Sequence, residues 1–173
     1  MPRIVHENEL FKVEESEVTI KDKKFNHHKI IENDTVVILP VTRHGYILLE
    51  NQYRPGLNGM LYELPSGHIE NGEDMLEAAK RELEEETGFK AGKITFMTYF
   101  YSSPGIISKK ESLYLAENLT KGITHFDSDE EITVKEFKIE DCLKMIESNE
   151  IIHAPTIIAL LYFTQIMQNK AQS

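Results

Sequence analysis

Four glutamates lie close together in RELEEETG, residues 81–88. In a helix, residues i, i+3 and i+4 share one face, so Glu82, Glu85 and Glu86 converge while Glu84 points elsewhere as a solvated bystander. Like charges on neighbouring turns repel by roughly a few tenths of a kcal/mol per pair, and a divalent cation would turn that repulsion into a binding site. The spacing therefore predicts either a Mg²⁺ site or an ordinary solvated acidic helix.

A longer pattern around these glutamates favours the metal site. The stretch GHIENGEDMLEAAKRELEEETGF, residues 67–89, resembles the Nudix box, the hallmark of the Nudix hydrolases. The positions in register with that motif are Gly67, Glu73, Arg81, Glu82, Leu83, Glu85, Glu86, Gly88 and Phe89. At average residue frequencies of roughly 7%, seven fixed identities at fixed spacing would arise by chance well below about one time in a million. By this resemblance the chain is identified as a member of the family.

The resemblance implies metal ligands among the matched positions. Glu82 and Glu86 are expected to bind the metal directly, and Glu85 is expected either to bind it or to contribute to catalysis through a water. The backbone carbonyl of Ser66 matches the position that often adds a ligand. A glycine at position 67 suits a tight loop that brings backbone close to metal and phosphates. Glu73 and Arg81 match the family's polar pair, which holds this loop against the helix.

The resemblance also implies an activity. Nudix hydrolases cleave nucleoside diphosphates linked to another moiety, by water attack on one phosphorus. A divalent metal, Mg²⁺ or alternatively Mn²⁺, would polarise the pyrophosphate and lower the pKa of the attacking water. Such a metal explains how a chain of formal net charge -10 takes an anionic substrate, whereas the same charge argues against nucleic acid or an anionic membrane as a partner.

Two flanking segments indicate which Nudix enzyme this is. LLENQYRPGLNGMLYELPSGHIENGE (48–73) resembles the QYR…ELPAG stretch of the ADP-ribose pyrophosphatase group, and YSSPGIISKKESLYLAENL (101–119) resembles its SPG…YLA segment. The substrate-binding residues that these matches imply are Tyr53, Arg54, Glu63, Pro104 and Gly105. We expect hydrolysis of ADP-ribose to AMP and ribose 5-phosphate, with a GDP-sugar or CDP-alcohol as the alternative substrate. The non-enzymatic alternative is a Nudix-fold regulator that binds a nucleotide sugar without cleaving it.

Lys109 departs from the group's pattern. Members commonly carry glutamate four residues after the glycine of SPG, whereas this chain has Lys109 there and Glu111 two residues later. The lysine either meets a phosphate or another terminal group of the substrate, or lies on a loop that is merely exposed.

The general base is expected outside the acidic helix. It must reach the attacking water, and in this group it can come from a loop beyond the box. The candidates are the acids of DSDEEI, with Glu130 preferred over Glu131 and Asp129.

Hydrophobic patterning predicts the elements that position these residues. A helix is expected from Glu73 to Thr87, which lacks Gly and Pro, with Gly88 ending it. Residues 10–32 predict two or three antiparallel strands around KDKK, and residues 35–41 and 46–54 predict a hairpin. Further strands are expected near 93–101, 111–117 and 132–137, and helices near 139–148 and 154–168. The fold class is α/β: a Nudix-type α/β/α sandwich with a mixed central sheet, preceded by a small N-terminal antiparallel β element.

Two units are expected in the 173 residues: the β element, 1–34, and the Nudix hydrolase domain, 35–173. Residues 1–34 are too few to bury a core of their own, so they are expected to pack against a second subunit in a homodimer. The single cysteine, Cys142, and the absence of an apolar run approaching roughly 18 residues indicate a cytoplasmic protein.

Overall fold

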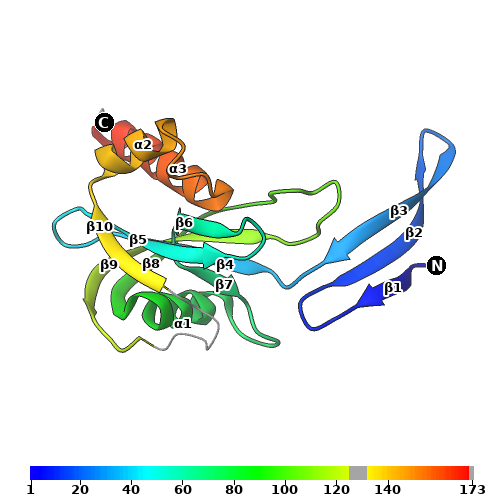
Figure 1. Ribbon diagram of the computed structural model, residues 1–173, viewed down its shortest axis with the longest axis horizontal. Coiled ribbons are helices and arrows are strands. Elements are labelled where there is room, and N and C mark those ends of the chain that lie inside the picture. The colour runs from blue at the N-terminus through cyan, green and yellow to red at the C-terminus, as the bar shows by residue number, and fades with distance from the viewer. Residues whose placement is uncertain (125–131, 172–173) are drawn as a thin grey trace.

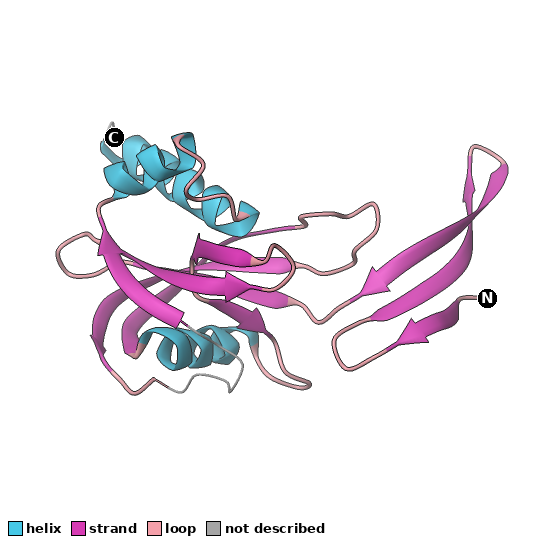
Figure 2. Cartoon of the chain, in the orientation of Figure 1, coloured by secondary structure: helices cyan, strands magenta, loops and turns pink. Residues whose placement is uncertain are grey.

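A computed structural model describes residues 1–124 and 132–171 of the chain. Figures 1 and 2 show a layered body with a separate β-sheet beside it at the N-terminal end. The elements, in chain order, are β1 (Arg3–Glu7), β2 (Lys12–Ile20), β3 (Lys23–Ile31), β4 (Thr35–Pro40), β5 (Ile47–Arg54), β6 (Gly59–Glu63), β7 (Ser66–His68), α1 (Met75–Thr87), β8 (Phe89–Phe100), β9 (Glu111–Lys121), β10 (Ile132–Phe137), α2 (Ile139–Glu147) and α3 (Ala154–Ala171). Within these ranges no helix is long and apolar enough to cross a membrane.

Two sheets form the middle layer of the body. One has the strand order β7-β4-β9-β8, with β4 and β9 parallel and the other neighbours antiparallel. The other has the order β10-β5-β6 and is antiparallel throughout. Helix α1 covers one side of this layer, and α2 and α3 cover the other (Figure 1). The predicted sandwich with a mixed central sheet is therefore confirmed.

Strand β4 contributes to the hydrophobic core on both sides of the sheet, because successive side chains of a strand point to opposite faces. Val36 and Ile38 belong to the buried cluster that includes α1. Val37 and Leu39 belong to the larger cluster that includes α2 and α3. Side chains of β4 therefore pack with α1 on one face of the sheet and with α2 and α3 on the other face.

The ends of α1 follow from its capping residues. Asp74 has an extended backbone and its side chain accepts a hydrogen bond from Leu76 N at 2.8 Å, so the helix begins at Met75 and not at Glu73 as predicted. Gly88 ends the helix as predicted: its φ is 70°, and its N–H donates to the Glu84 carbonyl at 2.8 Å.

The predicted hairpin of residues 35–41 and 46–54 is wrong. Strands β4 and β5 belong to different sheets, and their recorded pairing is the isolated bridge between Val41 and Ile47. Because β7 and β9 occupy both edges of β4, β5 pairs with β6 and β10 instead. Strands β6 and β7 were not predicted, since segments of five and three residues give little periodic signal.

The N-terminal sheet, β1-β2-β3, lies apart from the body (Figures 1 and 2). Its β2–β3 hairpin turns at Lys21 and Asp22, both with positive φ, as the KDKK segment predicted. No residue of 1–34 is buried. The sheet is tied to the body where Ile30 N donates to Ile106 O at 2.8 Å and Ser108 N donates to Ile30 O at 3.1 Å.

Candidate active site

A cavity of about 650 Å³ opens at one end of the middle layer, beside α1 and the start of α3. Five carboxylates and three cationic side chains are among its lining residues: Glu63, Glu70, Glu82, Glu86, Glu111, Arg54, Arg81 and Lys109. These residues come from segments that are far apart in the sequence, so the fold brings them together. The cavity combines acidic groups for a cation with basic groups for an anion.

Glu82 and Glu86 lie one helical turn apart on α1 and are only 9% and 4% exposed. Ser66 N donates to Glu86 Oε2 at 2.8 Å. A Cβ built on Gly67 would lie 2.0 Å from Glu82 Oε1, so position 67 has no space for a side chain. The backbone at 66–67 is therefore packed directly onto both carboxylates.

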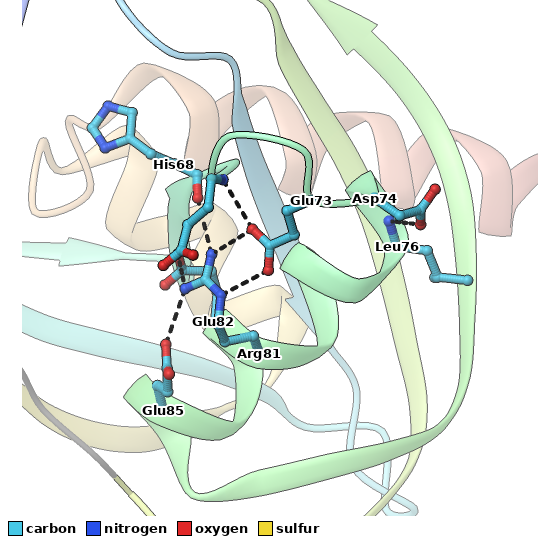
Figure 3. Close-up of polar contacts among 8 residues, drawn as sticks. His68, Glu73, Asp74, Leu76, Arg81, Glu82 and Glu85 are labelled. Atoms are coloured by element: carbon cyan, nitrogen blue, oxygen red, sulfur yellow. Dashed lines mark hydrogen bonds and ion pairs between the residues drawn. The ribbon is translucent and has the colours of Figure 1, made fainter.

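Arg81 links three glutamates and the loop before the helix (Figure 3). Its Nε and Nη2 donate to Glu73 at 2.9 Å each, which confirms the predicted pair. Its Nη1 donates to Glu82 at 2.7 Å and to Glu85 at 3.0 Å, and its Nη2 also reaches the His68 carbonyl at 3.0 Å. The hydrogen bonds from Arg81 lower the pKa of Glu73, and those to Glu73 raise the pKa of Arg81.

The donor set suits a hard divalent cation. Glu82 and Glu86 supply carboxylate oxygens, and the backbone of Ser66 and Gly67 packs directly against both side chains. In the described part of the chain, no three His, Cys, Asp or Glu side chains lie close enough together to hold a metal ion. Arg81 Nη1 lies 2.7 Å from Glu82 Oε1 and 3.0 Å from Glu85 Oε2, so these two oxygens are paired with a guanidinium.

Glu84 points away from the cavity, as its helical position predicted. Its Oε1 accepts a hydrogen bond from Ile123 N at 3.3 Å and lies 3.2 Å from Lys90 Nζ. Its side chain is 27% exposed. The expectation of a freely solvated Glu84 is therefore wrong: this residue anchors the segment after β9 to α1.

Arg54 and Glu63 form a second charged pair across β5 and β6. Glu63 is 1% exposed, and Arg54 donates to it from Nε at 3.0 Å and from Nη2 at 2.7 Å. These bonds, together with the charge of Glu63, raise the pKa of Arg54 against the opposing effect of burial. The buried carboxylate fixes the guanidinium at the cavity wall.

The predicted site residues are only partly gathered at the cavity. Those that line it are Arg54, Glu63, Ser66, Glu82 and Glu86, whereas Tyr53, Glu85, Pro104 and Gly105 do not line it. Tyr53 instead donates its hydroxyl to Asn58 Oδ1. Glu130 and Glu131, the candidate general bases, lie outside the described residues, as does Asp129. The roles of all these residues stay predictions.

Sequence reasoning gave no role to Glu111 or His153, which also line the cavity. Glu111 is buried at the start of β9, where the parallel pairing of β4 and β9 places it opposite Thr35. His153 directly precedes α3, and its Nδ1 lies 3.0 Å from Thr156 Oγ1 and 3.7 Å from Glu63 Oε2. Burial is the main cause that lowers the pKa of His153, so its imidazole is neutral near pH 7.

Comparisons with known proteins agree with this arrangement. A family model described as the NUDIX domain matches residues 32–159. The chain is 38% identical over 149 residues to an ADP-ribose pyrophosphatase of Bacillus subtilis (strain 168), covering 84% of this chain and 80% of that protein. It is 30% identical over 154 residues to a methanol dehydrogenase activator of Bacillus methanolicus, covering 87% and 83%. A crystal structure of an ADP compounds hydrolase has the same fold, with a TM-score of 0.89, 23% identity and coverage of 100% and 95%.

Proposed function

The chain belongs to the Nudix family and is a pyrophosphohydrolase, and we propose that its substrate is ADP-ribose, cleaved by water to AMP and ribose 5-phosphate. The observation that carries this proposal is the cavity that Glu82, Glu86 and Arg54 line together. It places two nearly buried carboxylates beside a fixed guanidinium, which suits a cation-bound pyrophosphate. The ADP-ribose pyrophosphatase among its relatives supports the choice of substrate.

The enzyme uses a divalent metal, for which we propose Mg²⁺, with Mn²⁺ as the other candidate. Glu82, Glu86 and the Ser66 carbonyl would hold it, with Glu85 as a further ligand or as a contributor through water. When bound, the cation polarises the pyrophosphate and lowers the pKa of the attacking water. Oxygen ligands of this kind favour hard cations over soft ones.

Arg54 would orient the substrate. Glu63 engages the Nε and Nη2 side of the guanidinium, so we assign the Nη1 side to oxygens of a phosphate or ribose. Glu63 is buried and paired with Arg54. If Arg54 rotated away, the buried carboxylate would lose this ion pair, which is energetically costly. Glu130 is the preferred general base, ahead of Glu131, from the segment after β9.

Product identification tests the function. The protein is incubated with ADP-ribose, GDP-mannose, CDP-choline, NADH and diadenosine polyphosphates, each with Mg²⁺ or Mn²⁺. The products are separated by chromatography and identified by mass spectrometry. We expect AMP and ribose 5-phosphate in equal amounts from ADP-ribose, at the highest kcat/KM of the panel. Faster cleavage of GDP-mannose or CDP-choline would show that a GDP-sugar or CDP-alcohol is the substrate instead of ADP-ribose. Stoichiometric binding without product would show that the protein is a regulator and not an enzyme.

We further propose that residues 1–34 pack against a second subunit of a homodimer. The support is that none of these residues is buried and that Ile4, Ile20 and Phe25 of the sheet and Leu10 between β1 and β2 are exposed. Light scattering at micromolar concentrations should give twice the 20.0 kDa chain mass. A constant monomer mass would contradict the proposal.

A cytoplasmic location also stays a proposal, for which the buried, unbridged Cys142 is the support.

A further inference from the structure

Three cationic side chains of the described residues line the cavity, and they differ in how many hydrogen bonds and ion pairs hold them. Three hydrogen bonds join Arg54 to Glu63, and Arg81 is joined to three glutamates of its own segment. Lys109 has a single recorded ion pair, from its Nζ to Glu32 Oε2 at 3.0 Å. A lysine ammonium on a flexible stem can exchange such a partner by side-chain rotation alone. Lys109 is therefore the cavity cation best able to change partner.

The backbone of Lys109 is fixed even though its side chain can rotate. Residues 106–108, just before it, pair with the end of β3: Ile30 N donates to Ile106 O and Ser108 N donates to Ile30 O. Glu32 follows β3 directly, so the same contact places the ion pair at the cavity. The charge of Lys109 also contributes to lowering the pKa of His153 on another wall of the cavity. The ammonium thus acts on the interior and not only on the outer surface.

The charge balance of the cavity makes Lys109 important for any additional anion. Among the described residues, five carboxylates and three cationic side chains line the cavity, so this part of the lining carries net negative charge. A divalent cation would serve the pyrophosphate that is cleaved, and a further phosphate on the substrate would need a cation of its own. Lys109 and Glu32 are 24% and 22% exposed, so their charges are only partly screened by water.

We propose that Lys109 is a specificity-determining residue that binds a phosphate beyond the two of the cleaved pyrophosphate, and that Glu32 is the counter-ion which this phosphate displaces. A phosphate monoester carries more charge and offers more acceptor oxygens than a carboxylate, and a phosphate within a chain carries the same single charge, so either can compete with Glu32 for the ammonium group. The extra phosphate can belong to a longer phosphate chain or to a phosphate ester on the distal sugar. This inference rests on the proposed function, because it selects among substrates of the same hydrolysis.

The test compares kcat/KM for ADP-ribose, ADP-ribose 1″-phosphate and diadenosine triphosphate, with Mg²⁺, in the wild-type protein and in variants. Lys109→Ala should lower the ratio of kcat/KM for either extra-phosphate substrate to kcat/KM for ADP-ribose by about tenfold or more, the effect of losing one charge-assisted hydrogen bond. Lys109→Arg should retain most of the preference. Loss with only one of the two substrates identifies which phosphate Lys109 meets.

Lys110→Ala is the matched control. Lys110 is the next residue, is 29% exposed, pairs with Asp34 at 3.6 Å and does not line the cavity. The Lys110→Ala variant loses the same charge as Lys109→Ala. Its ratio of kcat/KM values for the extra-phosphate substrates and ADP-ribose should nevertheless equal that of the wild-type protein. An equal fall in Lys109→Ala and Lys110→Ala would mean a general charge effect and would overturn the proposal.

Glu32→Gln separates substrate binding from a structural role of the ion pair. Removing the competing carboxylate should raise the preference for extra phosphate by about threefold, because a weaker competitor remains for Lys109. If the pair only holds the loop, Glu32→Gln and Lys109→Ala should change the ratio in the same direction, and the proposal fails. No hydrolysis of any substrate by the wild-type protein would instead refute the proposed function.

Discussion

The backbone of Gly67 lies against the carboxylate of Glu82 so closely that a methyl group at position 67 would fall 2.0 Å from Oε1. Gly67→Ala must therefore displace Glu82, the first of the proposed metal ligands. We predict a loss of turnover of at least about 10²-fold, since a displacement of about 1 Å in a catalytic site has this effect. Steady-state hydrolysis of ADP-ribose, with circular dichroism as the check on folding, measures it.

Gly59→Ala is the control for this prediction. A Cβ at position 59 would meet only the Leu57 carbonyl oxygen at 3.8 Å, an ordinary contact. This variant should keep near wild-type turnover, and an equal loss in both variants would indicate that the short strands β6 and β7 tolerate no added methyl group.

The general base is predicted among the acids that follow β9. Glu130→Gln should lower turnover by at least ~10²-fold while the affinity for Mn²⁺ survives, because a base acts on the water and does not hold the metal. If Glu131 is the base, the loss should appear in Glu131→Gln instead. Near wild-type rates in both variants would remove the assignment.

His153 should make stability depend on pH. Burial lowers the pKa of its imidazole, so the folded state binds its proton less readily than the unfolded chain, whose pKa is about 6.5. The contribution of His153 to the free energy of unfolding is constant above about pH 6.5, and the free energy of unfolding falls as the pH drops below this value. Charges that act on it come from Glu63, Arg54, Glu111 and Lys109.

Urea denaturation at pH 7.5 and pH 5.5 measures this dependence. The wild-type protein should lose more stability between the two pH values than His153→Gln, which has no group to protonate at that position. An equal or larger loss in the variant would show that the imidazole is charged without cost in the folded state.

Cys142 should be chemically inert in the folded protein. The thiol is fully buried on α2, and burial raises its pKa to about 12. At pH 8 the thiolate fraction is then about 10⁻⁴, and the thiolate is the reactive form. Iodoacetamide should label the thiol rapidly in urea and very slowly in buffer, as followed by mass spectrometry. Rapid labelling in buffer would contradict the burial of α2.

The sequence was sufficient to predict features that depend on one helix. Glu82 and Glu86 share a face of α1 because helical spacing is fixed, and Gly88 ends the helix because αL geometry favours glycine. The motif resemblance also predicted a segment at Gly67 held against this helix by Glu73 and Arg81, and Arg81 does bond to Glu73 and to the His68 carbonyl. Such features are local, so neighbouring residues alone determine them.

Features that depend on long-range packing were not predicted. The predicted β4–β5 hairpin is wrong because β7 and β9, which come later in the chain, occupy both edges of β4. His153 reaches Glu63 only because α3 begins at the cavity, and Lys109 meets Glu32 only because β3 pairs with residues 106–108. No periodicity or spacing in the sequence relates these pairs.

Glu82 and Glu86 are proposed to bind the metal because of their position on α1, whereas Glu84, two residues from each, is not. The most direct measurement is the initial rate of AMP release from ADP-ribose with Mg²⁺ for three variants. Glu82→Gln and Glu86→Gln should each lose about 10²-fold or more. Glu84→Gln should keep near wild-type turnover, because its amide oxygen can still accept the hydrogen bond from Ile123 N. Similar rates in all three variants would contradict the account.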